Sequence, residues 1–462
     1  MCKFSPVLKQ FIAILCCNLL TLSFGLISGW ATINYNELQS ENSTFATGPL
    51  NLEEASLVIS ILNVGGFLGN FAIVPISQLI GVKRTLHLLG PLLIVSTLLI
   101  LYAKSVYYLY VSRFAAGFVS GAIIVGIPTL VNDISYDGVR GALNSLYDPS
   151  FNLGIIISFA LGNYLSCLDQ AKVQLIIPLI FMLAMFLLPE SPEYWSNRNN
   201  EKRAMKSRKF YKGSIAALEK VDFIQVPNDD ELENGKLNDV TDESKTNSKL
   251  TLQDFLTPQA KKAFFIAFTA FTLSFLSGTM TIVSYVTDIF VKTGSSFSAK
   301  NSSLFIAIIQ ISANLVLLNF VERVNRRTLY IWSSILATVS FLLLAAYCCL
   351  WIKKPEYEWM PPFCIACIVF ISCMGLLPIP YIITIEIFPK KIRQTCLALA
   401  ASTMWLILFV LAWIFPILLE KFGLFSCMIA LAVMCSLNAV FGMFFIPETR
   451  GKSYEEIMEL LS

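Results

Sequence analysis

The fold is decided by a stretch near the start of the chain, FIAILCCNLLTLSFGLISGWATI at residues 11–33, which contains no charged side chain. A helix needs about 20 consecutive apolar residues to cross the hydrocarbon core of a bilayer, and this stretch is long enough. It follows Lys3 and Lys9, as a secretory signal would, but it exceeds the apolar core of about 7–15 residues that such signals carry. We therefore expect the first membrane-spanning helix here.

Comparable stretches recur along the rest of the chain. Of the 462 residues, 56% are hydrophobic and 14% are charged, whereas soluble globular proteins are about 25% charged. Backbone polar groups in hydrocarbon need partners within the protein, so long apolar runs of this kind form helices. Twelve spans are expected, at residues 11–33, 56–76, 86–103, 106–131, 144–165, 172–188, 263–287, 302–321, 329–350, 360–385, 396–418 and 424–446.

The hydrophilic interval at residues 190–260 divides these spans into six and six. We therefore predict an all-α membrane protein with an N-terminal six-helix bundle over residues 1–189 and a C-terminal six-helix bundle over residues 261–446. The interval is expected to be a cytoplasmic loop made of short helices and a flexible linker. Residues 447–462 are expected to form a cytoplasmic tail.

Two independent signals place both ends of the chain in the cytoplasm. With the N-terminus inside, the short inner loops hold more Lys and Arg than the outer loops, as the positive-inside rule requires. The sequons that begin at Asn42 and Asn301 then both fall outside. We therefore expect glycosylation at Asn42 and Asn301.

Two inner loops at equivalent places in the two halves are similar to each other. The loop after the second span reads QLIGVKR at residues 78–84, and the loop after the eighth span reads ERVNRR at residues 322–327. This similarity indicates an internal repeat. Transporters are often built from such repeats, with the substrate bound near the midplane between them.

Further motifs occur in order along the chain. They are Arg113, Gly117, Gly121, Pro128, Asp133 and Arg140-Gly141 around the fourth span, Pro189-Glu190-Ser191-Pro192 after the sixth, Pro378-Ile379-Pro380-Tyr381 in the tenth, Glu386-Ile387-Phe388-Pro389 with Arg393 after it, and Pro447-Glu448-Thr449-Arg450-Gly451-Lys452-Ser453 after the twelfth. Together with ERVNRR they resemble the motifs of the sugar porter family of the major facilitator superfamily (MFS), and most closely its insect facilitated trehalose and hexose transporters. The resemblance covers nearly the whole chain and implies an MFS fold.

The resemblance also implies a network of charges at the cytoplasmic ends of the helices. Arginine pairs with carboxylates in a bidentate, pre-shaped geometry, so pairs between the two halves can form in one state of a transporter and part in another. We call this the cytoplasmic latch. Its first half is degraded, because Gln78, Leu79 and Val82 replace an acid, an arginine and another base of the family. The network would comprise Arg113, Asp133, Arg140, Glu190, Glu322, Arg323, Arg326, Arg327, Glu386, Arg393 and Glu448.

A sugar site needs amides and hydroxyls for the ring hydroxyls and aromatic surface for the apolar faces. The resemblance implies a substrate site in which several amides are lost, since Ser274-Phe275 replaces two glutamines, and Met280 and Met404 each replace an asparagine. Each lost hydrogen bond is worth about 1 kcal/mol. The predicted site residues are Asp148, Tyr285, Gln310, Pro378, Pro380, Tyr381 and Trp405.

Asp148 is the most informative departure, because it stands at a position where the family has glutamine. A carboxylate inside a membrane is a functional candidate by default. It would bind a cation, take part in proton coupling or hydrogen-bond a sugar. The alternative is a residue at the inner water interface, shortly after Arg140-Gly141.

The predicted function is facilitated diffusion of a sugar of the trehalose or hexose class by alternating access. The first span reads FGLISGW at residues 24–30, without the acid that proton-coupled sugar porters of the family carry. The alternatives are a diverged porter for another polar organic solute and a non-transporting nutrient sensor. The chain lacks a P-loop, a nucleophile elbow and a metal-ligand cluster, so we expect no enzyme, no metal and no cofactor. Expected partners are a small solute and the lipid bilayer of the plasma membrane, with no nucleic acid and with the monomer as the functional unit.

Overall fold

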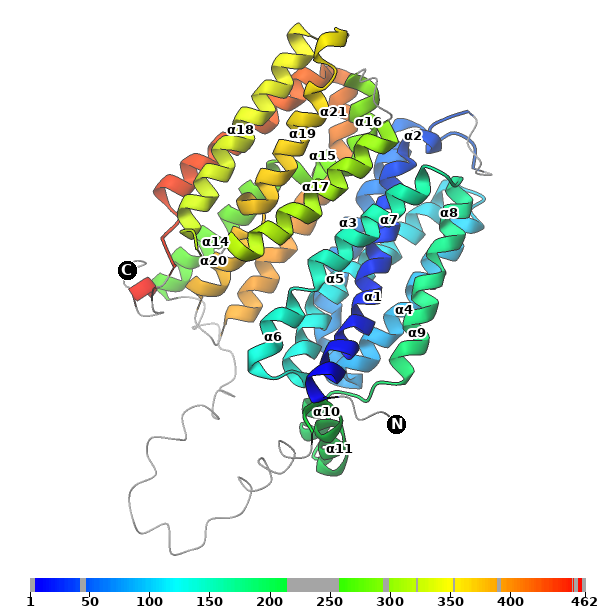
Figure 1. Ribbon diagram of the computed structural model, residues 1–462, viewed down its shortest axis with the longest axis vertical. Helices are drawn as coiled ribbons and strands as arrows, with labels where there is room; N and C mark the ends of the chain where they lie inside the picture. Colours follow the sequence, from blue (N-terminus) through cyan, green and yellow to red (C-terminus); the bar gives the residue numbers. More distant parts are fainter. Residues whose placement is uncertain are drawn as a thin grey trace, which may run out of the picture.

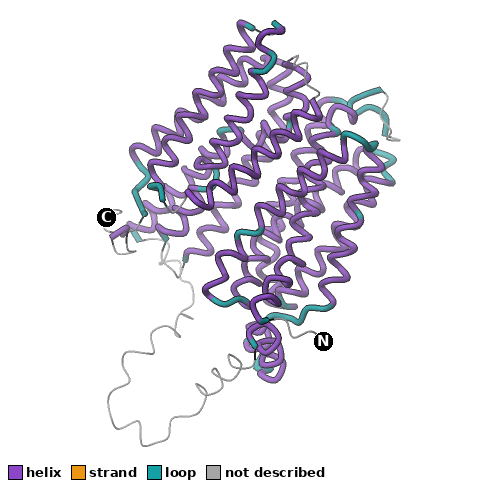
Figure 2. Tube along the Cα trace, viewed as in Figure 1, coloured by secondary structure: helices purple, strands orange, loops and turns teal. Residues whose placement is uncertain are grey.

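The computed structural model describes residues 5–41, 47–213, 257–293, 299–320, 323–351, 354–388, 392–450, 452 and 456–458. Every regular element in these ranges is a helix, as the tube in Figure 2 shows. The prediction of an all-α chain is therefore confirmed.

The helices of the first half pack on one another, with α3 against α5 and α1 against α7. Their bounds are α1 Pro6–Ile33, α2 Tyr35–Leu38, α3 Leu52–Ile80, α4 Val82–Leu101, α5 Val106–Ile134, α6 Asp137–Asn144, α7 Tyr147–Gly162, α8 Cys167–Gln174, α9 Ile176–Phe186, α10 Pro192–Ser196 and α11 Glu201–Lys212.

The helices of the second half form a second group, in which α18 and α14 both pack against α21. Their bounds are α14 Pro258–Leu276, α15 Thr279–Ser284, α16 Val286–Thr293, α17 Ala299–Phe320, α18 Arg326–Leu350, η2 Pro355–Tyr357, α19 Met360–Ile371, η3 Ser372–Leu376, α20 Ile379–Ile387 and α21 Arg393–Phe444.

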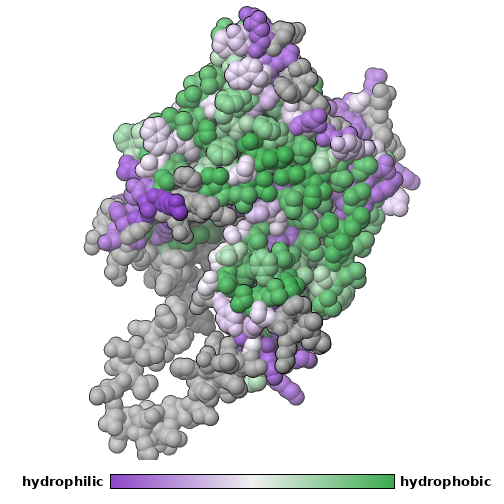
Figure 3. Space-filling view, in the orientation of Figure 1, coloured by the Kyte–Doolittle hydropathy of each residue, from purple (hydrophilic) through white to green (hydrophobic). Residues whose placement is uncertain are grey.

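Within the described ranges, nine helices are long and apolar enough to cross a membrane. Hydrophobic side chains cover a broad band of the face seen in Figure 3, and hydrophilic side chains gather toward the ends of the helices. The chain is therefore a multi-pass membrane protein. The nine are Pro6–Ile33, Leu52–Ile80, Val82–Leu101, Val106–Ile134, Cys167–Phe186, Pro258–Ser284, Arg326–Leu350, Met360–Ile387 and Thr395–Phe444.

Local sequence explains where helices begin and where they pack closely. At the start of α3, the Asn51 side chain accepts from the backbone N–H of Glu54 at 2.8 Å, and Glu54 accepts in return from the N–H of Asn51 at 3.0 Å. This capping box satisfies two backbone donors that the first turn leaves free. Farther along, a Cβ on Gly117 of α5 would lie only 1.8 Å from the Leu62 carbonyl oxygen of α3, so only glycine permits this approach.

Two predicted spans are interrupted, and the loop predicted between the last two spans is a kink within one helix. Gly278 has φ 74° and separates α14 from α15, and Gly423 has φ 77° and breaks α21. A positive φ is accessible to glycine at little cost. In the tenth span, the π-helical turn η3 lies between α19 and α20, directly before Pro378 and Pro380. Proline cannot donate a backbone hydrogen bond, so the helix cannot run on regularly through this segment.

The two groups of helices lie side by side, with α2 and α16 at one end of the molecule and α10 and α11 at the other (Figure 1). They meet along two seams, where α3 packs on α21 and α7 packs on α17. At the first seam, Nδ2 of Asn70 donates to Oγ of Ser402 at 2.9 Å. Gly66 lies under the ring of Trp405, because a Cβ there would be 2.6 Å from a ring carbon.

Candidate transport site and cytoplasmic carboxylates

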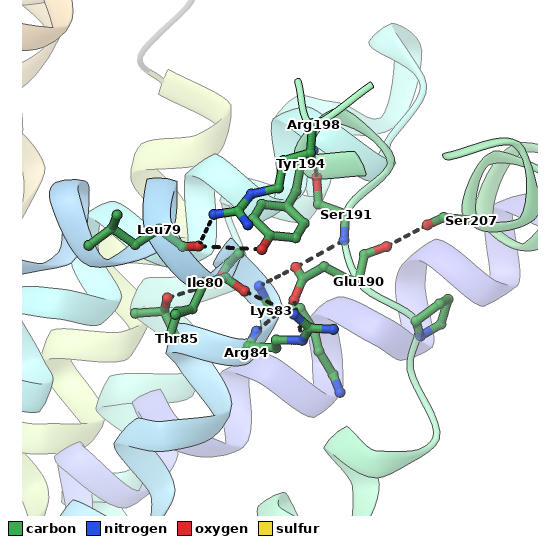
Figure 4. A network of polar contacts seen from close by, with 12 residues as sticks. Leu79, Ile80, Lys83, Arg84, Thr85, Glu190, Ser191, Tyr194, Arg198 and Ser207 are labelled. Atoms are coloured by element: carbon green, nitrogen blue, oxygen red, sulfur yellow. Dashed lines mark hydrogen bonds and ion pairs between the residues drawn. The ribbon is translucent and has the colours of Figure 1, made fainter. Parts of the chain in front are cut away.

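The carboxylate of Glu190 caps the N-terminus of α4. Its two oxygens accept from the backbone N–H groups of Lys83 at 2.8 Å and Arg84 at 3.0 Å, and one of them also accepts from Ser191 N–H at 3.0 Å. Figure 4 shows this carboxylate directed at the first turn of the helix. The first N–H groups of a helix lack internal partners and carry partial positive charge, so a buried anion is well placed there.

Glycine is required beside this carboxylate. Gly81 has φ 102°, and a Cβ on it would lie 2.6 Å from the carboxylate carbon of Glu190. The Arg84 guanidinium adds a longer contact, with Nε 3.9 Å from Oε2 of Glu190. The loop of the first half, although it has lost family residues, therefore still binds the carboxylate of Glu190.

The second half repeats this arrangement at the start of α18. Oε1 of Glu448 accepts from the N–H of Arg326 at 3.0 Å, and Oε2 accepts from the N–H of Arg327 at 3.2 Å. Oε1 also accepts from the N–H of Arg450 at 3.0 Å. Glu190 and Glu448 thus perform the same local task at equivalent helix starts, as the predicted internal repeat implies.

The hydroxyl residue that follows each carboxylate reaches a second acid. Ser191 Oγ donates to Oδ2 of Asp133 at 2.5 Å, and Thr449 Oγ1 donates to Oε2 of Glu386. The other oxygen of Glu386 lies 3.5 Å from Nη2 of Arg326. These described contacts of the predicted latch residues join helices of the same half.

The remaining predicted network residues are placed as follows. Arg113 is buried within α5, where Nη1 donates to Ile27 O at 2.7 Å and Nε donates to Val58 O at 3.2 Å. Arg140 lies in α6, Arg323 is exposed in the turn before α18, and Arg393 is the first residue of α21. Arg327 donates to the carbonyl of Met443. Glu322 and the predicted glycosylation site Asn42 lie outside the described residues, whereas Asn301 is exposed in the first turns of α17.

Aromatic and sulfur-containing side chains line the predicted substrate region in the second half. Tyr381 follows η3, and its ring meets that of Phe271 edge-on with centroids 4.7 Å apart. Its hydroxyl lies 2.9 Å from the Met404 sulfur. Pro380 is buried and Pro378 is partly buried at the start of α20. The two prolines thus position the Tyr381 ring.

Ser274 does not line this region, although it stands at a glutamine position of the family. Its Oγ lies 3.1 Å from the Tyr330 hydroxyl, which in turn donates to Oδ1 of Asn438 at 2.5 Å. All three side chains are buried within the second half. The residue therefore ties α14 to α18 and α21, and its hydroxyl is already engaged.

Among the buried polar atoms near the seams that have no hydrogen-bond partner in the described structure, two belong to predicted site residues. They are Oε1 of Gln310 on α17 and Nε1 of Trp405 on α21, whose residues are 3% and 5% exposed. Buried polar groups are nearly always paired. An acceptor and a donor without protein partners are therefore available to a polar solute or to water.

Tyr285 lies at the end of the molecule that carries α2 and α16. Its ring meets that of Tyr35 from the first half edge-on, with centroids 5.0 Å apart, and its hydroxyl donates to Ala412 O at 2.5 Å. Both tyrosines are almost completely buried. Tyr285 therefore takes part in a contact that joins the two halves at this end.

Comparison with known proteins decides the family. The family described as Sugar (and other) transporter matches residues 9–461. The chain belongs to this sugar transporter family. It is 26% identical to the facilitated trehalose transporter Tret1 of Polypedilum vanderplanki over 98% of its own length, covering 88% of that protein. It is 27% identical to Tret1 of Bombyx mori over 89% of its length, covering 80% of that protein. The chain spans 50% of the longer Tret1 of Drosophila willistoni, at 26% identity.

Solved structures confirm the MFS fold of this member of the family. The inward-open xylose transporter XylE from E. coli superposes with a TM-score of 0.76 at 17% identity, covering 98% of this chain and 99% of that one. Its partially occluded inward-open form gives 0.77 at 16% identity, with 96% and 99% covered. The recognised resemblance to sugar porters and insect trehalose transporters is confirmed. Since the family consists of transporters, this chain is not an enzyme.

The sequence analysis of this transporter missed the aromatic residues of α10. Arg84 lies over the ring of Trp195 at 5.3 Å and Arg203 lies over the same ring at 4.7 Å, while Arg198 lies over Tyr194 at 5.1 Å. Arg198 also donates to the carbonyl of Leu79 at 2.5 Å. Leu79 replaces a family arginine, and Arg198, in the turn after α10, brings a positive charge to the Leu79 carbonyl from another element. The sequence does show two adjacent aromatic residues, Tyr194 and Trp195, shortly after the Pro189-Glu190-Ser191-Pro192 motif.

Proposed function

We propose that this chain carries a sugar of the trehalose or hexose class across the plasma membrane by facilitated diffusion. The observation that carries the proposal is the family match over residues 9–461. The names of the Tret1 relatives and of XylE, a xylose transporter, support a sugar as substrate. The absence of an acid in FGLISGW of α1 favours passive movement.

The proposed topology has twelve spans with both termini in the cytoplasm. The nine long helices supply most of them, the break at Gly423 divides the last one in two, and the shorter α7 and α17 add the remaining two. The proposed units are bundles at residues 1–189 and 261–446, the cytoplasmic loop at 190–260 and the tail at 447–462. The monomer is the proposed functional unit, since each MFS bundle pair encloses its own site.

The proposed mechanism is alternating access between the two halves. Substrate contacts are assigned to Asp148, Gln310, Tyr381 and Trp405, with Pro378 and Pro380 as positioning residues and Tyr285 in closure of the outer side. The cytoplasmic acids and arginines form the latch in the state in which their ends approach. In the conformation described here, Glu190 and Glu448 instead cap helices within their own halves.

The topology is tested by glycosylation. Asn301 and Asn42 both belong to loops proposed to be outside, so Asn301→Gln and Asn42→Gln should each remove one glycan from protein expressed in insect cells. The measurement is the shift in electrophoretic mobility after endoglycosidase treatment. A native chain that carries no glycan on Asn301, exposed in α17, would contradict the proposed orientation of that loop.

The transport proposal is tested by radiolabelled uptake in oocytes with glucose, trehalose and a polyol at two pH values, with surface expression checked. Saturable, pH-independent uptake supports it. Gln310→Ala removes the buried amide and should lower kcat/KM about fivefold, as for one lost hydrogen bond of about 1 kcal/mol. The matched control is Gln78→Ala, an exposed glutamine at the cytoplasmic end of α3. No uptake of any sugar by well-expressed protein would overturn the proposal and favour another solute or a sensor.

A further inference from the structure

The carboxylate of Asp148 is unusual in its surroundings. It lies in the first turn of α7, the helix that forms one of the two seams with the second half. Its side chain is exposed in the described structure. Among the described residues, no side chain forms a hydrogen bond or an ion pair with either of its oxygens.

An ionised carboxylate at membrane depth requires water or a cation, because exposure to lipid is costly. The buried cation of the same half does not supply the charge, since Arg113 donates to the carbonyls of Ile27 and Val58 instead. The exposed carboxylate lies at the start of α7, which packs against α17 of the second half. Within the described residues no cationic side chain pairs with this carboxylate, so its counter-ion has to come from solution.

Tyr147 precedes this carboxylate in the same helix. The helix α7 packs against α17, which in turn packs against η3 of the tenth span, directly before α20 with Tyr381. The Tyr381 ring packs edge-on against the fully buried Phe271, with centroids 4.7 Å apart, and keeps part of its own surface exposed. Aromatic faces attract cations electrostatically, most strongly when water is excluded.

The side chains of this region have few free hydrogen-bonding groups for a neutral solute with many hydroxyls. Ser274 is engaged with Tyr330, and the Tyr381 hydroxyl points to the Met404 sulfur. The unpartnered Oε1 of Gln310 adds a second acceptor. A carboxylate, a free amide oxygen and aromatic faces are the groups that recognise an ammonium ion carried on a hydroxylated ring.

We propose that Asp148 is the counter-ion for a protonated amine, so that the transporter selects amino sugars over neutral hexoses. This inference rests on the proposed transport function and specifies the substrate of the same site. The ammonium group would replace water at the carboxylate during entry. Because a passive carrier would then move one positive charge with each solute, its uptake should respond to membrane potential.

The test compares glucosamine with glucose, which differ at one ring substituent, in proteoliposomes that contain the purified full-length chain. Each solute carries a different radiolabel, and uptake is followed with and without a negative inside potential set by a potassium gradient. The variants are Asp148→Asn and Asp148→Gln. The matched control is Asp169→Asn, which removes an exposed carboxylate on α8. Calorimetry with both sugars measures binding to the same preparations.

The expected result is a preference for glucosamine of about tenfold or more in kcat/KM, with uptake accelerated by the negative potential. Asp148→Asn should reduce glucosamine uptake about tenfold to a hundredfold, as for a hydrogen bond to a charged group, and should reduce glucose uptake by a smaller factor, so that the preference for glucosamine is lost. A thermal unfolding midpoint equal to that of the native chain shows that the variant is folded. Asp148→Gln repeats the test if the asparagine variant is unstable.

The outcomes separate the inference from the transport proposal. Uptake of both sugars at a ratio that neither Asp148 variant changes would overturn the inference and leave the transport proposal standing. Binding of glucosamine that is lost in Asp148→Asn, without uptake of either sugar, would support the assigned site and overturn the carrier function. Neither uptake nor binding of either sugar would overturn both.

Discussion

At the scale of single residues, the two capping carboxylates make the strongest prediction. Glu190→Gln should destabilise the protein by about 1–3 kcal/mol, because the N–H groups of Lys83 and Arg84 lose an ionised acceptor. Glu448→Gln should act in the same direction and with similar size on α18. The measurement is the thermal unfolding midpoint of the detergent-solubilised protein, which should fall by several degrees in each variant.

Glu53→Gln is the control for both substitutions. Glu53 is exposed in the first turn of α3, so only a weak interaction with the helix dipole is lost, worth a few tenths of a kcal/mol. If either capping variant unfolds at the same temperature as Glu53→Gln, the capping role of that carboxylate is wrong.

These carboxylates also show what sequence could predict and what it could not. The motifs placed Glu190 and Glu448 at cytoplasmic helix ends, and the matching loops indicated the repeat. The partners were assigned across the halves, whereas the described contacts lie within each half, because free N–H groups at a nearby helix start compete for the same carboxylate. The hydrogen bonds of Ser274 were harder to predict, because its partner Asn438 lies 164 positions away and no local pattern connects the two residues.

At the scale of elements, the docking of α10 and α11 depends on stacked arginine and aromatic side chains. Trp195→Ala removes the ring over which both Arg84 and Arg203 lie. Each exposed cation–π contact is worth about 0.5–1 kcal/mol, so α11 should open more often, by about fivefold to thirtyfold. The measurement is hydrogen–deuterium exchange at residues 201–212. Tyr164→Ala, which removes an aromatic ring that is 88% exposed, should leave exchange there unchanged.

The broken spans give a second prediction at this scale. Gly423→Ala should cost about 1–2 kcal/mol through its positive φ alone, because nothing lies within 4 Å of an added Cβ. Gly278→Ala should cost more, since the added Cβ would also lie 2.5 Å from a Leu431 methyl group. Thermal unfolding of both variants is compared with Gly138→Ala, which has an ordinary φ and open space and should be neutral or slightly stabilising. Equal midpoints for all three variants would contradict the role of these glycines.

Sequence periodicity located the nine long apolar helices of the described ranges but could not show that the predicted spans 263–287 and 360–385 are broken. An apolar run remains apolar whether its backbone is straight or broken, so residues 263–287 read as one helix. The residue that decides the break is a single glycine, and Gly278 looks no different in sequence from Gly117, which packs two helices together. Only the tertiary environment distinguishes a glycine needed for φ from one needed for space.

At the scale of the whole molecule, the two halves contact each other along two seams and at one end. The seams of α3 with α21 and of α7 with α17 run along the sides. The end contact joins Tyr35 of α2 to Tyr285. A transporter that opens alternately to the two sides must separate one end while the seams act as hinges, so the tyrosine pair is expected to part in the outward-open state.

Tyr35→Ala should therefore shift the population toward the state that is open at this end. An edge-on aromatic pair contributes about 0.5–1.5 kcal/mol beyond its buried area, which corresponds to a shift of a few-fold to about tenfold. The measurement is hydrogen–deuterium exchange in α2 and α16, which should accelerate, together with slower exchange at the starts of α4 and α18, at the opposite end. Tyr107→Ala is the control, because it breaks an edge-on pair with Tyr110 within one helix. Faster exchange in α2 without any change at α4 and α18 would indicate local fraying, and would contradict the coupling between the two ends that alternating access requires.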